Sequence, residues 1–172
     1  KSGLYPENII TELWRELYKK NPNNSNLLIT RARKLMSLSE YEFAQSLIDR
    51  VTTIEPLDPE PYLLLYLIDL DNQDFTSALI HLNYSIERLD TDENYWIGES
   101  IFKLGMSELT KEGFDLNEEQ VSVDDLKLLR IKLYHEMGQY AMMCDELDNL
   151  FNNIRDNDNL QEINELIIEN CH

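Results

Sequence analysis

A repeat of 34 residues organises the middle of this chain of 172 residues. Pro22 and Pro56 are 34 residues apart, and Asp90 follows Pro56 after another 34. A fixed period of this length indicates stacked supersecondary units, each of which buries its apolar face only against its neighbours. The same spacing separates two further pairs, Tyr41 and Phe75, and Ala44 and Ala78.

The segments between these repeated residues show the apolar periodicity of helices. Each aromatic residue of the repeat is followed three positions later by alanine, whose small side chain lets two helices approach closely. An acidic residue precedes the aromatic one and favours a helix N-terminus. Gly and Pro number only five each, which favours helices over a turn-rich β fold. Apolar residues then recur at helical spacing in two series: Leu47, Ile48, Val51 and Ile54, then Leu79, Leu82, Ile86 and Leu89.

These repeated residues and their spacing resemble the tetratricopeptide repeat (TPR) family, whose unit is a helix A, a short turn and a helix B. The resemblance is good for two units, over residues 25–92, and partial in helix A, where the family's Trp and Leu-Gly positions are weak. It implies an all-α fold, a right-handed α-solenoid of antiparallel helix pairs. The matching positions are Glu40, Tyr41, Ala44 and Pro56 in one unit, and Asp74, Phe75, Ala78 and Asp90 in the next.

The flanking segments extend the same architecture. About eight helices are expected in a single TPR-like domain over 1–172, with an irregular third unit. The lone helix B at the start suggests that a solenoid continues upstream. The predicted parts are a partial unit (helix B) at 7–20, units at 25–56 and 59–90, a long helix plus an insertion at 93–121, a unit at 123–154 and a capping helix at 159–170.

A concave face built from helix A is where such repeats bind partners. The resemblance implies a partner-binding groove, although its apolar residues can equally be core. Three leucines, Leu63, Leu67 and Leu70, would anchor an apolar or amphipathic helix. The family's two-carboxylate clamp for acidic chaperone tails is absent, because Ile29 and Leu64 replace polar residues of the clamp. The candidate groove residues are Asn26, Ile29, Arg33, Met36, Glu60, Leu63, Leu67, Leu70, Asn94, Ile97 and Ile101.

The formal net charge of −18 bears on the choice of partner. A negative field repels nucleic acid and anionic membranes, so neither is expected as a partner. Acidity also serves solubility, and a basic or amphipathic protein partner is the remaining electrostatic expectation. The longest apolar stretch, Tyr62 to Ile68, is too short to span a bilayer, so no membrane insertion is expected.

Residues that could carry chemistry are scattered. His81 and His135 lie far apart in predicted helices, and the Asp-rich run 156–159 lacks the glycine and distal glutamate of a calcium loop. Cys144 and Cys171 form no CxxC pair, and nothing in their spacing suggests a disulfide. We therefore expect no enzyme activity, no cofactor and no metal site, and an intracellular, cytoplasmic setting.

Two functional hypotheses follow. The first is a non-catalytic protein-interaction module that forms part of a scaffold or multi-subunit assembly. The alternative is a stand-alone adaptor, similar to a co-chaperone, whose apolar concave groove binds an amphipathic helical peptide. Oligomeric state is left open, although an unpaired first helix exposing Trp14 and Leu17 could drive self-association.

Overall fold

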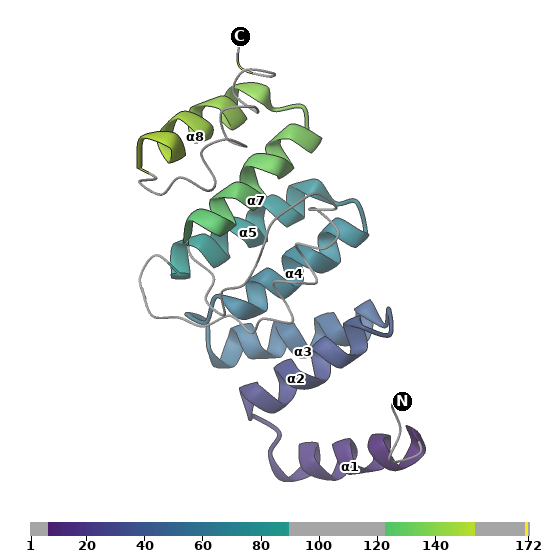
Figure 1. The fold of residues 1–172 in the computed structure, drawn as a ribbon. Helices are drawn as coiled ribbons and strands as arrows, with labels where there is room; N and C mark the ends of the chain where they lie inside the picture. The colour runs from purple at the N-terminus through teal and green to yellow at the C-terminus, as the bar shows by residue number, and fades with distance from the viewer. Residues whose placement is uncertain (1–6, 90–122, 154–170, 172) are drawn as a thin grey trace, which may run out of the picture. The chain divides into compact units, whose positions relative to one another are not determined.

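The computed structural model describes residues 7–89, 123–153 and 171. Every regular element in these ranges is an α-helix, which confirms the all-α prediction for this part of the chain. The chain divides into two compact units, Lys1–Pro56 and Leu57–His172. The helices, coloured along the chain in Figure 1, are α1 (Glu7–Lys20), α2 (Ser25–Met36), α3 (Tyr41–Ile54), α4 (Glu60–Asp71), α5 (Phe75–Leu89), α7 (Val123–Glu136) and α8 (Tyr140–Asn153).

In the first unit, α2 and α3 form a helical hairpin. Ala32 of α2 and Ala44 of α3 are completely buried, and their small side chains allow the two backbones to approach closely. Buried residues recur at intervals of four and three along each helix, which places them on a single stripe. The core of the hairpin contains Leu28, Ile29, Ala32 and Leu35 from α2 and Ala44, Ile48 and Val51 from α3.

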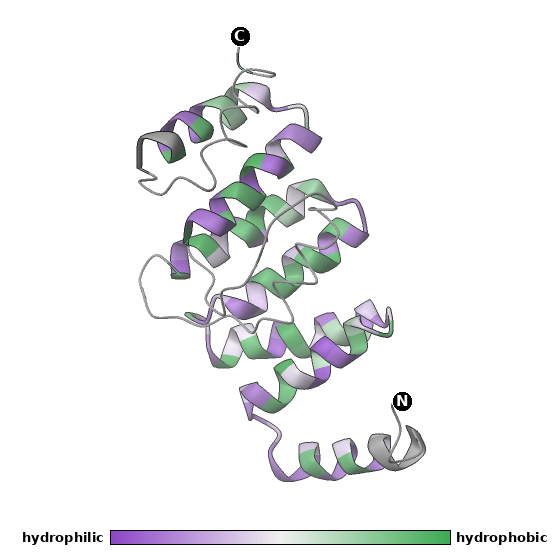
Figure 2. Cartoon of the chain, in the orientation of Figure 1, coloured by the Kyte–Doolittle hydropathy of each residue, from purple (hydrophilic) through white to green (hydrophobic). Residues whose placement is uncertain are grey.

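The second unit contains α4, α5, α7 and α8. Helix α4 is apolar on most of its surface, as Figure 2 shows, and it pairs with α5. Helix α5 also packs against α7, which pairs with α8. Met143 of α8 is fully buried where the earlier hairpins have alanine. The core between α7 and α8 consists of Leu128, Ile131, Tyr134, Met143, Leu147 and Leu150, and Leu79 of α5 packs against it.

One turn geometry closes all three hairpins. Two or three residues after the end of each first helix, one residue has a left-handed backbone: φ is 59° at Ser39, 58° at Gln73 and 69° at Gly138. In the first turn, Ser39 N–H donates to Met36 C=O and Glu40 N–H donates to Leu35 C=O. Equivalent pairs of hydrogen bonds occur after α4 and after α7. This arrangement is the Schellman motif, which satisfies the last carbonyls of a helix before the chain reverses.

Polar side chains fasten α7 to its two neighbours. Arg130 of α7 donates to both carboxylate oxygens of Glu146 on α8, with Nε 2.8 Å from Oε2. Its Nη1 donates to Asn83 Oδ1 on α5 at 2.6 Å. A planar guanidinium is suited to such forked contacts, because its donors are held in fixed directions. One side chain therefore orients three helices of this unit.

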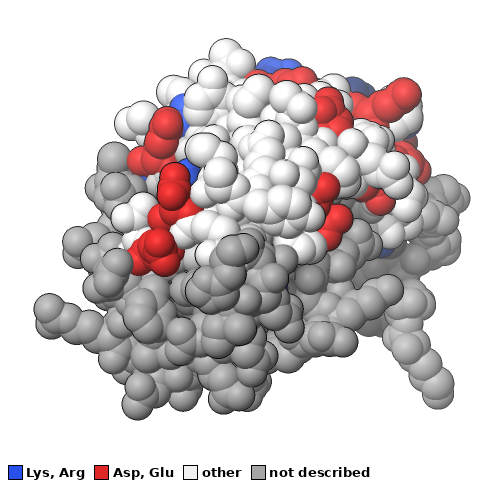
Figure 3. All heavy atoms as spheres, turned by 90° about the horizontal axis from the view of Figure 1, so that it is seen from above, with Lys and Arg blue, Asp and Glu red and all other residues white. Residues whose placement is uncertain are grey.

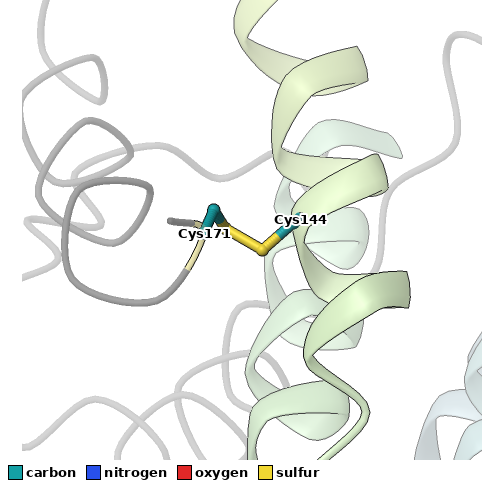
Figure 4. The surroundings of a disulfide bond; sticks show 2 residues. All are labelled: Cys144 and Cys171. Atoms are coloured by element: carbon teal, nitrogen blue, oxygen red, sulfur yellow. A yellow bond between two sulfur atoms is a disulfide. The ribbon is translucent and has the colours of Figure 1, made fainter.

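The cysteine prediction is wrong, because a disulfide joins Cys144 of α8 to Cys171 (Figure 4). Their Cα atoms are 5.7 Å apart although 27 positions separate them in the sequence. Cys171 packs against the core between α7 and α8. Spacing alone does not reveal such a pair, since connectivity depends on how the chain returns. The two cysteines therefore no longer support the expected intracellular setting.

The remaining sequence predictions divide between those inside and those outside the described residues. The predicted helix at 7–20 coincides with α1, and the predicted unit at 123–154 contains the pair of helices α7 and α8. The long helix plus insertion predicted at 93–121 and the capping helix predicted at 159–170 lie outside the described residues. The single domain, the solenoid path and the total of eight helices stay predictions. None of the described helices has the length and apolar run needed to cross a membrane.

Candidate protein-binding surface

The predicted groove residues of the first unit differ in exposure. Asn26 is exposed on the first turn of α2, and Arg33 and Met36 are half-buried. Ile29 is only 5% exposed and contributes to the core, which was the alternative to a role in partner binding. Three of these four side chains therefore retain surface that a partner could contact.

The predicted groove residues of the second unit lie on α4. Leu63 is 2% exposed and belongs to the core, and Glu60 is also buried. Leu67 and Leu70 are half-buried. The last three candidates, Asn94, Ile97 and Ile101, lie outside the described residues. Among the candidates on α4, only Leu67 and Leu70 combine an apolar side chain with surface open to a partner.

A groove that the sequence did not predict lies within the first unit. Its volume is about 700 Å³, and it is bounded by α1 on one side and by α2 and α3 on the other. Figure 1 shows α1 running beneath the α2–α3 hairpin. The side chains reach the groove at helical spacing, three or four residues apart on α1 and α3. The main apolar lining consists of Trp14, Tyr18, Leu27, Leu35, Phe43 and Leu47.

Arginine contacts hold α1 beside this groove. Arg50 of α3 donates a hydrogen bond to the hydroxyl of Tyr18, and its guanidinium lies 5.6 Å from the centre of that ring. Its other terminal nitrogen donates to Asn23 Oδ1 at 2.8 Å. On α2, the guanidinium of Arg31 lies 5.8 Å from the centre of the Trp14 ring. The two guanidinium–ring contacts are cation–π interactions, which add to the hydrogen bonds in holding α1 beside α2 and α3.

Charge is distributed unequally between the two units. Residues 1–56 contain eight Lys or Arg and seven Asp or Glu, a net charge of +1. Residues 57–172 contain seven basic and 26 acidic residues, a net charge of −19. In Figure 3, the described surface seen from above carries many carboxylates and few basic groups. The acidity of the chain therefore belongs to the second unit, and the groove lies in the first.

The basic charge of the groove lies on its α2 wall. Arg15, Arg31 and Glu40 line the groove. Arg15 lies 2.5 Å from Glu12 of α1 in an ion pair that offsets its charge. Helix α2 carries three basic residues, Arg31, Arg33 and Lys34, and no acidic one. An anionic group is therefore attracted to the α2 wall of the groove.

Shifted pKa values in the second unit have structural causes. Burial raises the pKa of Asp69, whose Oδ2 lies 2.6 Å from Nδ1 of His81 and so joins α4 to α5. Hydrogen bonds from Ser77 lower the pKa of Asp74, which caps the start of α5. Burial raises the pKa of Tyr66 far above its ordinary value. In the described residues, no three His, Cys, Asp or Glu side chains gather into a potential metal site.

No family model, curated protein or solved structure matches the chain. The likeness to TPR proteins is therefore carried by the repeat residues alone. Sequence reasoning missed the groove because it assigned binding to the exposed positions of helix A. The available signal was the stripe on α1 that includes Trp14 and Tyr18, two large aromatic residues for which the sequence offered no partner helix.

Proposed function

We propose that this chain is a non-catalytic, TPR-like protein-interaction module that forms part of a scaffold or multi-subunit assembly. The observation that carries the proposal is the recurrence of one helical hairpin, closed three times by the same left-handed turn. Repeated hairpins of this kind present extended side-chain surfaces to partners. The apolar groove in the first unit and the acidic second unit offer two chemically different surfaces of this type.

Retention of a partner tests this function. The purified chain is immobilised and exposed to the soluble proteins of its source cells, with excess free chain as competitor. We expect at least one protein to be retained, to be displaced by the competitor and, once purified, to form a complex of defined stoichiometry. Failure to form any such complex, with helical circular dichroism intact, would contradict the proposal.

The alternative is an adaptor that binds an amphipathic helical peptide on the face of α4. Leu67 and Leu70 favour it, because both are apolar and retain exposed surface. The adaptor hypothesis predicts that Leu67→Glu abolishes saturable, micromolar binding of such a peptide. Leu57→Glu is the control, since Leu57 lies before α4 and is 79% exposed. Equal binding by both variants would rule out the α4 face.

An intracellular, cytoplasmic location remains the expectation for a scaffold subunit. The Cys144–Cys171 disulfide argues against a strongly reducing compartment, where such bonds are rare. The redox state of these two cysteines in the source cells decides between a cytoplasmic location and a less reducing compartment.

A further inference from the structure

We propose that the groove between α1 and the α2–α3 hairpin docks an amphipathic partner helix whose apolar stripe is flanked by acidic residues. The inference rests on the proposed interaction function and names the surface and the chemistry of the partner. Three properties of the groove lead to it: its shape, its exposed apolar lining and the sign of its charges.

The shape of the groove suits a helix of about two turns. Its walls are helices, so their backbone N–H and C=O groups are already paired and offer no edge to an extended strand. On α1, the lining runs from Thr11 to Tyr18, a rise of about 10 Å at 1.5 Å per residue. A volume of about 700 Å³ accommodates several large apolar side chains. Recognition must therefore come from side chains that interdigitate, as between packed helices.

The apolar lining contains exposed residues that a partner would cover. Phe43 of α3 lines the groove and is 65% exposed, a high value for phenylalanine. Trp14 stands on the opposite wall and remains half-buried. Aromatic anchors facing one another across an apolar slot are typical of sites that receive one or two large side chains. Leu27 and Leu47 complete the slot for the apolar stripe of a helix.

The charges select the polar flanks of the partner. Arg31 lines the groove on α2, which also carries Arg33 and Lys34 and has no acidic residue, whereas Arg15 on the α1 wall is paired with Glu12. A helix with glutamates beside its apolar stripe would place opposite charges near these guanidinium groups. A helix with lysines at the same positions would meet like charge. The electrostatic preference for an acidic partner is thus local to the first unit and opposite to that of the acidic second unit.

A pair of synthetic peptides tests the proposal. Each has 18 residues with leucines at positions i, i+3, i+7 and i+10, and the two peptides differ only in carrying Glu or Lys at the flanking positions. In a Trp96→Phe background, Trp14 becomes the sole tryptophan and reports binding by fluorescence. We expect saturable binding of the Glu peptide and at least tenfold weaker binding of the Lys peptide.

Matched substitutions locate the binding surface. Phe43→Glu is expected to weaken binding of the Glu peptide at least tenfold, and Met142→Glu to leave it unchanged. Phe43 and Met142 are the third residues of α3 and α8, and both are more than half exposed, so neither change disturbs a core. Arg31→Glu is expected to reverse the preference between the two peptides. Lys34→Glu makes the same change of charge on α2 outside the groove and should preserve the preference.

Each other outcome overturns the proposal in a defined way. No saturable binding of either peptide by folded protein excludes a helix as occupant, and equal binding of both excludes charge selection. Loss of binding in Met142→Glu or Lys34→Glu, equal to that in Phe43→Glu or Arg31→Glu, excludes the groove. Self-association that Phe43→Glu abolishes, without peptide binding, assigns the groove to a second copy. A cellular partner that still binds the Phe43→Glu variant would show that the groove is not the binding site, while the proposed interaction function stands.

Discussion

Ser39 and Gln73, 34 residues apart in the sequence, adopt the same left-handed backbone, with φ angles of 59° and 58°. Gly138 adopts the corresponding conformation in the third hairpin, with φ of 69°. The repeat is therefore a repeat of backbone geometry as well as of residue type. Of these three turns, only the third has glycine at this position, and glycine alone adopts the left-handed conformation without a steric penalty.

The turns predict a pattern of stability changes. Ser39→Gly and Gln73→Gly are each expected to raise the free energy of unfolding by about 0.5–1 kcal/mol, because glycine removes the strain of a positive φ. Gly138→Ala is expected to lower it by roughly 1–2 kcal/mol. A Cβ at Gly138 would meet nothing within 4 Å, so this loss reflects backbone strain alone. Denaturant unfolding of each variant measures the changes.

Ser37→Gly is the control for these substitutions. Ser37 lies two residues before Ser39 but has an ordinary right-handed backbone, with φ of −63°. Glycine at this position gains nothing and adds freedom to the unfolded chain, so stability should fall slightly. A gain equal to that of Ser39→Gly would contradict strain relief as the cause.

The attachment of α1 depends on Arg50. Arg50→Ala removes the hydrogen bonds to Tyr18 and Asn23 and the cation–π contact with the Tyr18 ring. The expected loss is about 1–2 kcal/mol of local stability, which should appear as faster amide hydrogen exchange in α1. Lys19→Ala removes only an exposed pair with Glu16 and should change exchange little. Unchanged exchange in Arg50→Ala would mean that other contacts hold α1.

The disulfide makes a large expected contribution. Replacing Cys144 and Cys171 by serine opens a loop that spans 27 positions, which in the chain-entropy model costs roughly 3–4 kcal/mol. Thermal unfolding of the double variant should match that of the reduced wild-type protein and occur at lower temperature than that of the oxidised one. Rapid alkylation of both cysteines in native, unreduced protein would contradict the pairing.

A buried tyrosine without a hydrogen-bond partner predicts how its hydroxyl group affects stability. The Tyr66 hydroxyl is buried and has no hydrogen-bond partner among the described residues. Tyr66→Phe removes this unsatisfied group and is expected to leave stability unchanged or to raise it by up to about 1 kcal/mol. A loss of stability at neutral pH would indicate that the hydroxyl has a partner. Thermal unfolding at pH 7 distinguishes these outcomes.

The same substitution should change the alkaline limb of the stability profile. Burial raises the pKa of Tyr66 in the folded state. The contribution of Tyr66 to the free energy of unfolding is therefore complete below the pKa of an unfolded tyrosine, about 10. It is lost as the pH rises from that value toward the higher pKa of Tyr66 in the folded state. Tyr66→Phe should unfold less readily than wild type above pH 10. Tyr84→Phe, which alters an exposed tyrosine of α5, should retain the wild-type loss.

Local patterns in the sequence determined the helices and their pairing into hairpins. Apolar residues at helical spacing and the alanines at 34-residue intervals placed α3 and α5, and a helix predicted at 7–20 coincides with α1. These features depend on residues within a few turns of one another, so the sequence carries them directly. The burial of Ala44 and Ala78 follows from the same local pattern.

The tertiary structure alone decided three further features. It joined Cys144 to Cys171, placed Leu63 in the core, and held α1 by Arg50 so that a groove remains beside α2 and α3. Each depends on where distant segments of the chain return in space. Helical periodicity states which face of a helix is apolar, but it does not state what covers that face. The binding surface was therefore the part of this protein that its sequence left undetermined.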